Sequence, residues 1–194
     1  MIQGDDIVWS AWRHAAGLRA GRGLANLSEH NDAWLYGAGD AKIGSITEKG
    51  IKEGKALKER FTEAVPGLSQ LKRVVSYNVD NGGKLPGLDK RILPVRHKHA
   101  ALNTLLQSAG AVLCMEWLVS AYMTLSEKYR HGYRGDFVFV GWIHDELQVA
   151  CRSDIAEEVG QVLKACAEKA GLPFGFTVKL DSEYHIGRNW AETH

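Results

Sequence analysis

Apolar residues along the chain follow two patterns, one typical of helices and one typical of strands. From 100 to 129 they recur at helical spacing and form a stripe wide enough for a helix buried on several sides. Shorter, charged helices are expected over about 46–65 and 68–77, with a turn at Pro66-Gly67 between them. The longest helix is therefore expected to be the spine of the fold.

A β-hairpin is expected after this helix. The run 137–143 is uniformly apolar, aromatic and β-branched, as in a buried strand, and the alternating segment 147–151 follows directly after His144-Asp145-Glu146. These connecting residues are titratable, and a hairpin needs none of them to fold. A helix over 153–170, capped by its first or second residue, and a third strand over 177–181 complete an α+β fold.

Residues 1–33 show no clear period. Glycines interrupt any helical pattern, and the early tryptophans follow no spacing. Asp5 and Asp6 precede no apolar strand that the pattern identifies. This segment is therefore given no expected structure.

Composition excludes several classes of protein. Of 194 residues, 45% are hydrophobic and 24% charged, which is ordinary for a globular protein. The three cysteines are odd in number and show no CxxC spacing, so neither a disulfide framework nor a zinc site is indicated, and a reducing cytoplasm is expected. The longest segment without Lys, Arg, Asp or Glu, 99–115, is too short and polar to cross a bilayer, so no membrane is expected.

One stretch of the chain is locally basic. The net charge of +1 argues neither for nor against nucleic acid, but residues 84–99 carry five Lys or Arg against the single Asp89. This basic stripe fits a nucleic-acid backbone or a solvated loop equally well. At the hairpin tip the alternatives are also two: Asp145 as a ligand of Mg²⁺, which prefers carboxylate oxygens, or an exposed turn with solvated charges.

Four stretches of sequence carry a resemblance to a known family. Ile143-His144-Asp145-Glu146 resembles the third conserved motif of family A DNA polymerases. Three further stretches match in the same order: Leu35–Asp40 with Lys42–Gly44, His99–Ala111, and Asn189-Trp190 with the terminal histidine. Together, over 34–194, they resemble the replicative polymerases of short-tailed phages.

The resemblance implies a fold and a division into domains. It implies an antiparallel palm sheet with a metal-bearing β-hairpin, packed on long helices, plus a partial helical fingers segment. Residues 1–33 stand outside the family pattern, 34–83 correspond to part of the fingers, and 84–194 to the C-terminal part of the palm.

The resemblance also implies a reaction, template-directed nucleotidyl transfer with two Mg²⁺ ions in the complete site. Asp145 corresponds to one of two metal-binding aspartates, Glu146 to a supporting carboxylate, and His144 to a residue beside the primer terminus. Primer-template DNA and deoxynucleoside triphosphates are the implied partners. The remaining implied contacts are the DNA backbone (Arg91, Arg96, Lys98, His99), the minor groove (Asn103, Gln107), the nucleotide (Tyr36) and a chain-ending histidine (His194).

The match fails in two places. The family's fingers helix has an Arg, a Lys and an aromatic residue, of which the Arg and the Lys hold the triphosphate. This chain has Leu24, Ser28 and Asp32 at those positions, and no strand supplies the second aspartate. A split polymerase completed by an N-terminal fragment, the product of an intron-interrupted gene, or a truncated reading frame all fit. The alternatives to an enzyme half are a non-catalytic duplex-DNA-binding remnant and, more weakly, a metal-dependent nuclease.

Overall fold

The computed structural model describes the backbone of residues 6–13 and, in more detail, residues 39–46 and 50–193. The chain divides into two compact units. The first joins Met1–Gly17 with Gly110–His194, and the second is Leu18–Ala109.

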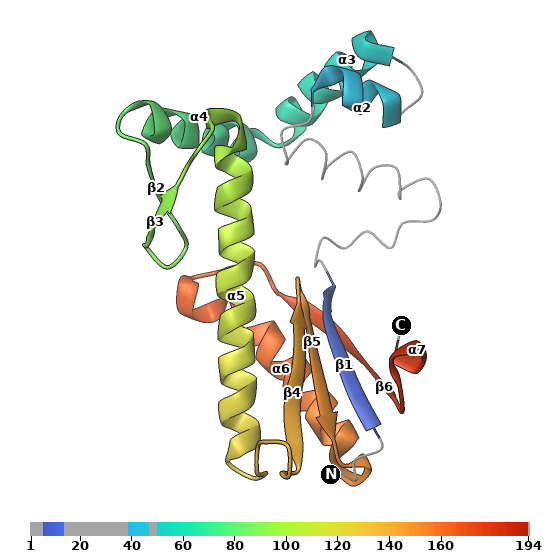
Figure 1. Cartoon of the computed structure of the whole chain (residues 1–194). Helices are drawn as coiled ribbons and strands as arrows, with labels where there is room; N and C mark the ends of the chain where they lie inside the picture. The colour runs from blue at the N-terminus through green and yellow to red at the C-terminus, as the bar shows by residue number, and fades with distance from the viewer. Residues whose placement is uncertain (1–5, 14–38, 47–49, 194) are drawn as a thin grey trace. The chain divides into compact units, whose positions relative to one another are not determined.

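The first unit contains a four-stranded antiparallel sheet in the order β4-β5-β1-β6 (Figure 1). The expected hairpin is confirmed, since β4 (Phe137–Ile143) pairs with β5 (Glu146–Cys151). Its register shifts between Phe139 and Gly141, so Val140 forms a β-bulge. The two inner strands, β5 and β1, are paired on both sides.

The expectation that no strand follows Asp5 and Asp6 is wrong. The segment Asp6–Arg13 forms β1, which pairs with β5 from Asp6↔Cys151 to Ala11↔Glu146 and with β6 from Ile7↔Gly187 to Arg13↔Asp181. The apolar residues of this strand neither alternate with polar ones nor form an uninterrupted run, because Ser10 separates them. It is held as a strand by pairing with β5 and β6, which come much later in the sequence, from Glu146 onward.

The third strand is also displaced from its expected place at 177–181, because β6 is Asp181–Gly187. Residues 177–180 form neither a helix nor a strand, and they follow a 3₁₀ turn, Leu172–Phe174, that ends at the left-handed Gly175. Packing against helix α6 favours a strand at 181–187. A Cβ at Gly160 of α6 would overlap the ring of Tyr184 in β6, so the glycine allows the strand to lie close to the helix.

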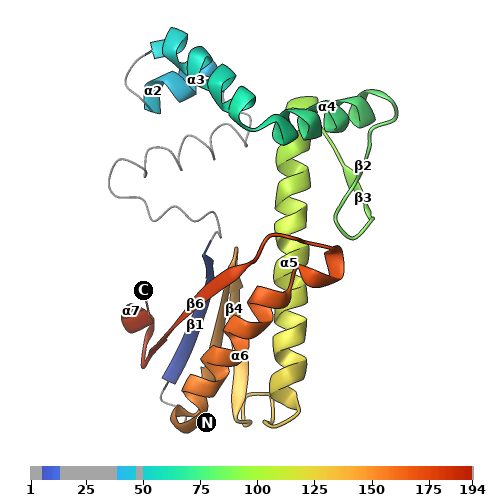
Figure 2. The same ribbon diagram turned by 180° about the vertical axis from the view of Figure 1, so that it is seen from behind.

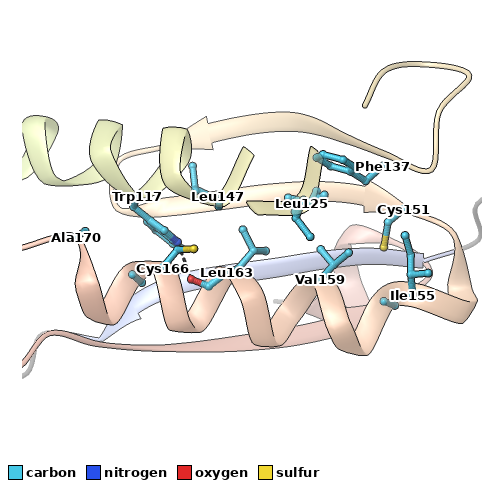
Figure 3. Packing of buried hydrophobic residues seen from close by; sticks show 14 residues of the cluster. Trp117, Leu125, Phe137, Leu147, Cys151, Ile155, Val159, Leu163, Cys166 and Ala170 are labelled. Atoms are coloured by element: carbon cyan, nitrogen blue, oxygen red, sulfur yellow. Dashed lines mark hydrogen bonds between the residues drawn. The ribbon is translucent and has the colours of Figure 1, made fainter. Parts of the chain in front are cut away.

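The core of the first unit lies between the sheet and two helices, α5 (Ala101–Ser126) and α6 (Ala156–Lys169). Figure 2 shows α6 lying along one face of the sheet. Trp117 of α5 is fully buried, and its Nε1 donates a hydrogen bond of 2.8 Å to the carbonyl of Leu163 in α6 (Figure 3). The indole fills the core and satisfies a backbone carbonyl, which joins the two helices.

Helix α6 begins differently from the expectation, because neither Ser153 nor Asp154 caps it. A 3₁₀ turn, Ser153–Ile155, precedes the helix, and no side chain caps either element. The Asp154 carboxylate instead accepts hydrogen bonds from Arg152, which also donates one of 2.7 Å to Asp136. The chain ends with the short helix α7 (Trp190–Thr193).

Within residues 39–46 and 50–109 of the second unit, the structure shows three helices, a two-stranded hairpin and the first turns of α5. The helices are α2 (Asp40–Ile46), α3 (Gly50–Ala64) and α4 (Pro66–Asp80). Pro66 begins α4 rather than a turn, as its fixed φ and missing N–H allow at a first helical position. Glycines permit close contact between α2 and α3, since a Cβ at Gly54 would overlap the carbonyl of Asp40.

The basic stripe, for which the sequence predicted no strand, contains a hairpin. Strand β2 (Lys84–Pro86) pairs with β3 (Ile92–Pro94). Leu85 and Leu93 from this hairpin are buried with residues of α4 and of the start of α5: Val75, Ala101 and Leu102. These two leucines thus fix a segment that is rich in Lys and Arg.

By length and composition alone, one helical stretch, Lys98–Ser126, could cross a membrane, within the part of the chain that the structure describes. The core helix of a soluble protein passes the same test, and Trp117, Ala121 and Leu125 of this helix are buried in the core.

Apolar side chains are exposed along β4, which is an edge strand of the sheet. Val140 is 55% exposed, and Trp142 and Ile143 are also exposed. On α5 a stripe at helical spacing is exposed as well: Met115, Val119, Tyr122 and Met123. Strand β4 contains no charged residue or proline, the usual features that prevent an edge strand from pairing with another chain.

We predict that the chain self-associates through the β4 edge and that Val140→Lys shifts it toward monomer, because a charged side chain at the edge disfavours pairing. Sedimentation velocity at increasing protein concentration measures this. Val178→Lys is the matched control, since Val178 is 63% exposed in the same unit but lies outside the sheet, and it should leave association unchanged. A monomer at all concentrations would contradict the prediction.

Candidate active site

The turn between β4 and β5 consists of His144 and Asp145, since Ile143 and Glu146 on either side are paired. His144 has φ +55, a left-handed conformation that glycine or asparagine adopts at lower cost. Such a conformation costs on the order of 1 kcal/mol for a non-glycine residue. A hairpin selected only for stability would carry a different residue here.

The strand before the turn holds it in place. Nε1 of Trp142 donates a hydrogen bond of 2.8 Å to the carbonyl of His144. Asp145, at the end of the turn, is exposed. A ring nitrogen thus fixes the backbone on one side of a carboxylate that faces solvent.

Cys114 of α5 lies close to this turn. Burial raises the pKa of its thiol to about 11, and the negative charge of Asp145 adds to the shift, while a hydrogen bond with Trp142 acts in the opposite direction. The thiol is therefore protonated at neutral pH. Cys114 acts here as a buried packing residue rather than a nucleophile.

Glu146, the first residue of β5, lies on the sheet face opposite the core. It accepts a hydrogen bond of 2.5 Å from Nε2 of Gln148, which is on the same face two residues further on. Across the sheet, Ala11 of β1 pairs with Glu146 on one side and with Glu183 of β6 on the other.

The end of β1 beside the hairpin turn carries no carboxylate, since the residues there are Ala11, Trp12 and Arg13. Asp181, opposite Arg13, forms an ion pair of 3.0 Å with Lys164 of α6. Within residues 39–46 and 50–193, no group of three or more His, Cys, Asp or Glu side chains could hold a metal ion.

The donor chemistry of the turn nevertheless fits part of a magnesium site. Mg²⁺ takes oxygen ligands, retains several waters, and commonly binds one or two carboxylates together with substrate phosphates. Asp145 and Glu146 provide two carboxylates on consecutive residues. They fit one side of such a site, and any further protein ligand has to come from another segment.

The DNA-contact candidates of the second unit lie on and after the β2–β3 hairpin, and two of them are already paired. Arg91 binds Asp89, which holds the pKa of that carboxyl below its usual range. Lys98 donates to Asp80 of α4 at 2.5 Å. Arg96 is exposed and forms no ion pair with the side chains that the structure describes.

A pocket of about 410 Å³ lies beneath the end of the basic stripe. It is lined by Lys72, Val75, Ser76, Lys98, His99 and Leu102. Three of the lining residues, Lys72, Val75 and Ser76, come from α4, and the sequence of the basic stripe gave no sign of them. The one available signal was that Lys72 and Ser76 are four residues apart and so lie on the same face of a helix.

The two candidate amides lie one turn apart on α5. Gln107 is exposed, and Oδ1 of Asn103 is buried without a hydrogen-bond partner among the described residues. Tyr36 and His194, the remaining candidates, fall outside the residues that the structure describes.

Comparison with known proteins assigns the class. The profile of "DNA polymerase family A" matches residues 29–192. The chain is 41% identical over 177 residues to the DNA-directed DNA polymerase of Enterobacteria phage T3 and 40% identical over 180 residues to that of Escherichia phage T7, each time over 83% of this chain and 25% of the relative. It is 27% identical to DNA polymerase I of Aquifex aeolicus, over 78% of this chain and 26% of that protein.

The chain belongs to DNA polymerase family A. It spans about a quarter of the length of the relatives that it matches. The matched region includes both the hairpin turn and the basic stripe, and it begins at residue 29, close to the expected start at 34.

We predict that Asp145→Asn lowers the pKa of Cys114, because it removes the negative charge that disfavours the thiolate. Alkylation of each cysteine, followed by peptide mass spectrometry between pH 7 and 10, measures this. Cys114 should react faster in the variant at alkaline pH, whereas Cys151 and Cys166 serve as internal controls with unchanged rates. An unchanged rate for Cys114 would mean that Asp145 does not act on the thiol.

Proposed function

We propose that this chain is the C-terminal fingers and palm portion of a DNA-directed DNA polymerase and carries one side of its catalytic metal site. The observation that carries the proposal is the hairpin turn, where His144 adopts a left-handed conformation beside the exposed Asp145. The family match over 29–192 supports it.

In the proposed reaction the primer 3′ hydroxyl attacks the α-phosphate of a deoxynucleoside triphosphate, and pyrophosphate leaves. Bound Mg²⁺ ions would stabilise the attacking and leaving oxygens. Asp145 is the proposed metal ligand, Glu146 supports it, and His144 lies against the primer terminus. Tyr36 is assigned to the incoming nucleotide by the same resemblance.

Duplex DNA is the proposed ligand of the second unit. Arg91, Arg96, Lys98 and His99 would contact phosphates, and Asn103 and Gln107 would donate to minor-groove acceptors, which occur on every base pair. These contacts would position the duplex without selecting its sequence.

A second polypeptide is proposed to complete the enzyme. The chain covers only 25% of its phage relatives, and no carboxylate lies at the end of β1 beside the hairpin turn. An N-terminal polymerase fragment would supply the second aspartate and the residues that hold the triphosphate. Bacterial cytoplasm, where phage replication occurs, is the proposed location, and the three buried free cysteines fit a reducing compartment.

A non-catalytic duplex-DNA-binding remnant is the second candidate. The observation that favours it is the basic stripe, where the exposed Arg96 can contact a phosphate without any metal ion. The two candidates share the DNA surface and differ in catalysis.

We predict that the chain alone does not extend a primer with Mg²⁺ and all four deoxynucleotides, and that mixing it with an N-terminal polymerase fragment restores extension. A radiolabelled primer resolved on a gel measures this. Asp145→Asn should reduce the restored rate by at least about 10³-fold, because a direct metal ligand is lost. Asp154→Asn, an exposed carboxylate paired with Arg152, is the control and should keep the rate.

Three results separate the possibilities. Robust extension by the chain alone would show that it contains a complete site. Restored activity that survives Asp145→Asn would move the metal site elsewhere. Association without restored activity would support the DNA-binding remnant.

We predict that the chain binds a primer-template duplex without sequence preference and with a steep salt dependence. Arg96→Ala should reduce the slope of log K against log salt by about one unit, since one phosphate contact is lost. Lys98→Ala should reduce it less, because Asp80 already binds that ammonium group. Fluorescence anisotropy over a range of salt concentrations measures both.

Two further variants test the assignment. Gln107→Ala should weaken binding and leave the slope nearly unchanged, because an uncharged amide displaces no counterions. Lys169→Ala, an exposed lysine at the end of α6, should change neither quantity. No binding at low salt would mean that this surface does not bind DNA in the isolated chain.

A further inference from the structure

Gln148 is a buried amide that none of the roles above uses. Only 6% of it is exposed, although it lies on the sheet face opposite the core. Its neighbours in the strand, Leu147 and Val149, are buried in that core. An apolar side chain would serve folding equally well at this position, since burying an amide costs free energy unless it is hydrogen-bonded.

The compensating hydrogen bond leads to the hairpin turn. Nε2 of Gln148 donates to Oε1 of Glu146 at 2.5 Å. A carboxylate is a stronger hydrogen-bond acceptor than a neutral oxygen. The partner of the buried amide is thus the carboxylate adjacent to Asp145.

The opposite strand leaves room for this arrangement. Gly141 pairs directly with Gln148, after the bulge at Val140. A Cβ at Gly141 would lie 2.8 Å from Oε1 of Gln148, so a side chain there would force the amide to move. The bulge and the glycine together create the space that the amide occupies.

We propose that Gln148 is a positioning residue, which holds the carboxylate of Glu146 in the orientation that supports metal binding by Asp145. The inference rests on the proposed function and deepens it, because it names what orients the supporting carboxylate. Glutamate has several rotamers on a strand, and a fixed donor reduces the entropy that Glu146 loses when an ion binds.

The test uses Gln148→Met, which keeps the length and approximate volume of the side chain and removes the donor. Mn²⁺, which broadens nearby NMR signals, is titrated into the isotope-labelled chain, and the broadening of the Asp145 amide is followed. We expect Gln148→Met to need about tenfold more Mn²⁺ for the same broadening, the effect typical of residues that orient metal ligands.

Gln161→Met is the matched control. Nε2 of Gln161 also donates to a glutamate, Oε1 of Glu157, at 3.1 Å, but on the exposed surface of α6. It should leave the Mn²⁺ response of Asp145 unchanged. Thermal unfolding of both variants shows whether either substitution acts through stability instead.

Each outcome decides one point. Equal Mn²⁺ responses in Gln148→Met and the unaltered chain would overturn the positioning role, as would a weaker response accompanied by general loss of the folded spectrum. If the Asp145 signal does not respond to Mn²⁺ in the unaltered chain, the positioning role is also overturned, whereas the proposed function is decided separately by primer extension after mixing with an N-terminal fragment. If the hairpin still responds in Asp145→Asn, then Asp145 is not the metal ligand, and the proposed function fails.

Discussion

The backbone ladder that joins β1 to β5 on one side and to β6 on the other holds the sheet together. Without β1, a gap of one strand would separate the β4–β5 hairpin from β6, and the backbone groups of β5 and β6 that face the gap would lack partners. Helix α6 packs on the same sheet, with Gly160 against Tyr184, so its place also depends on this ladder. The hairpin turn with Asp145 therefore lies at the end of a hairpin whose second strand, β5, is paired on both sides. An isolated two-stranded hairpin would be marginally stable in water.

The sequence predicted the helices and strands whose apolar residues recur at regular spacing or form an uninterrupted run. The long helix and the β4–β5 hairpin have long or uniformly apolar runs, and both were expected within a few residues of where they lie. The positions of β1 and β6 were not predicted correctly, because these strands form by pairing with each other and by the packing of Tyr184 over Gly160. The β2–β3 hairpin was missed for a related reason, since only two buried leucines anchor it.

The candidate site was likewise predicted only in part from the sequence. The pattern of residues identified Asp145 as chemically unusual, and the motifs supplied its neighbours and their roles. Sequence could not show that Lys98 is held by Asp80, that His144 has a positive φ, or that Gln148 contacts Glu146. Each of these depends on side chains or dihedral angles that spacing does not encode. They describe a constrained turn in the first unit and, in the second unit, a charged surface whose cations are partly neutralised.

The position of β1 in the sequence also affects how the chain folds as it is synthesised. Strand β1 ends at Arg13, whereas β5 begins at Glu146 and β6 at Asp181, so β1 leaves the ribosome long before either neighbour. At about 5 to 20 residues per second, the segment between Arg13 and Glu146 takes roughly 7 to 27 s to synthesise. Throughout this time, both edges of β1 are open to pairing with other chains. Faster synthesis of the segment between β1 and β5 therefore shortens the time during which β1 can pair with another chain.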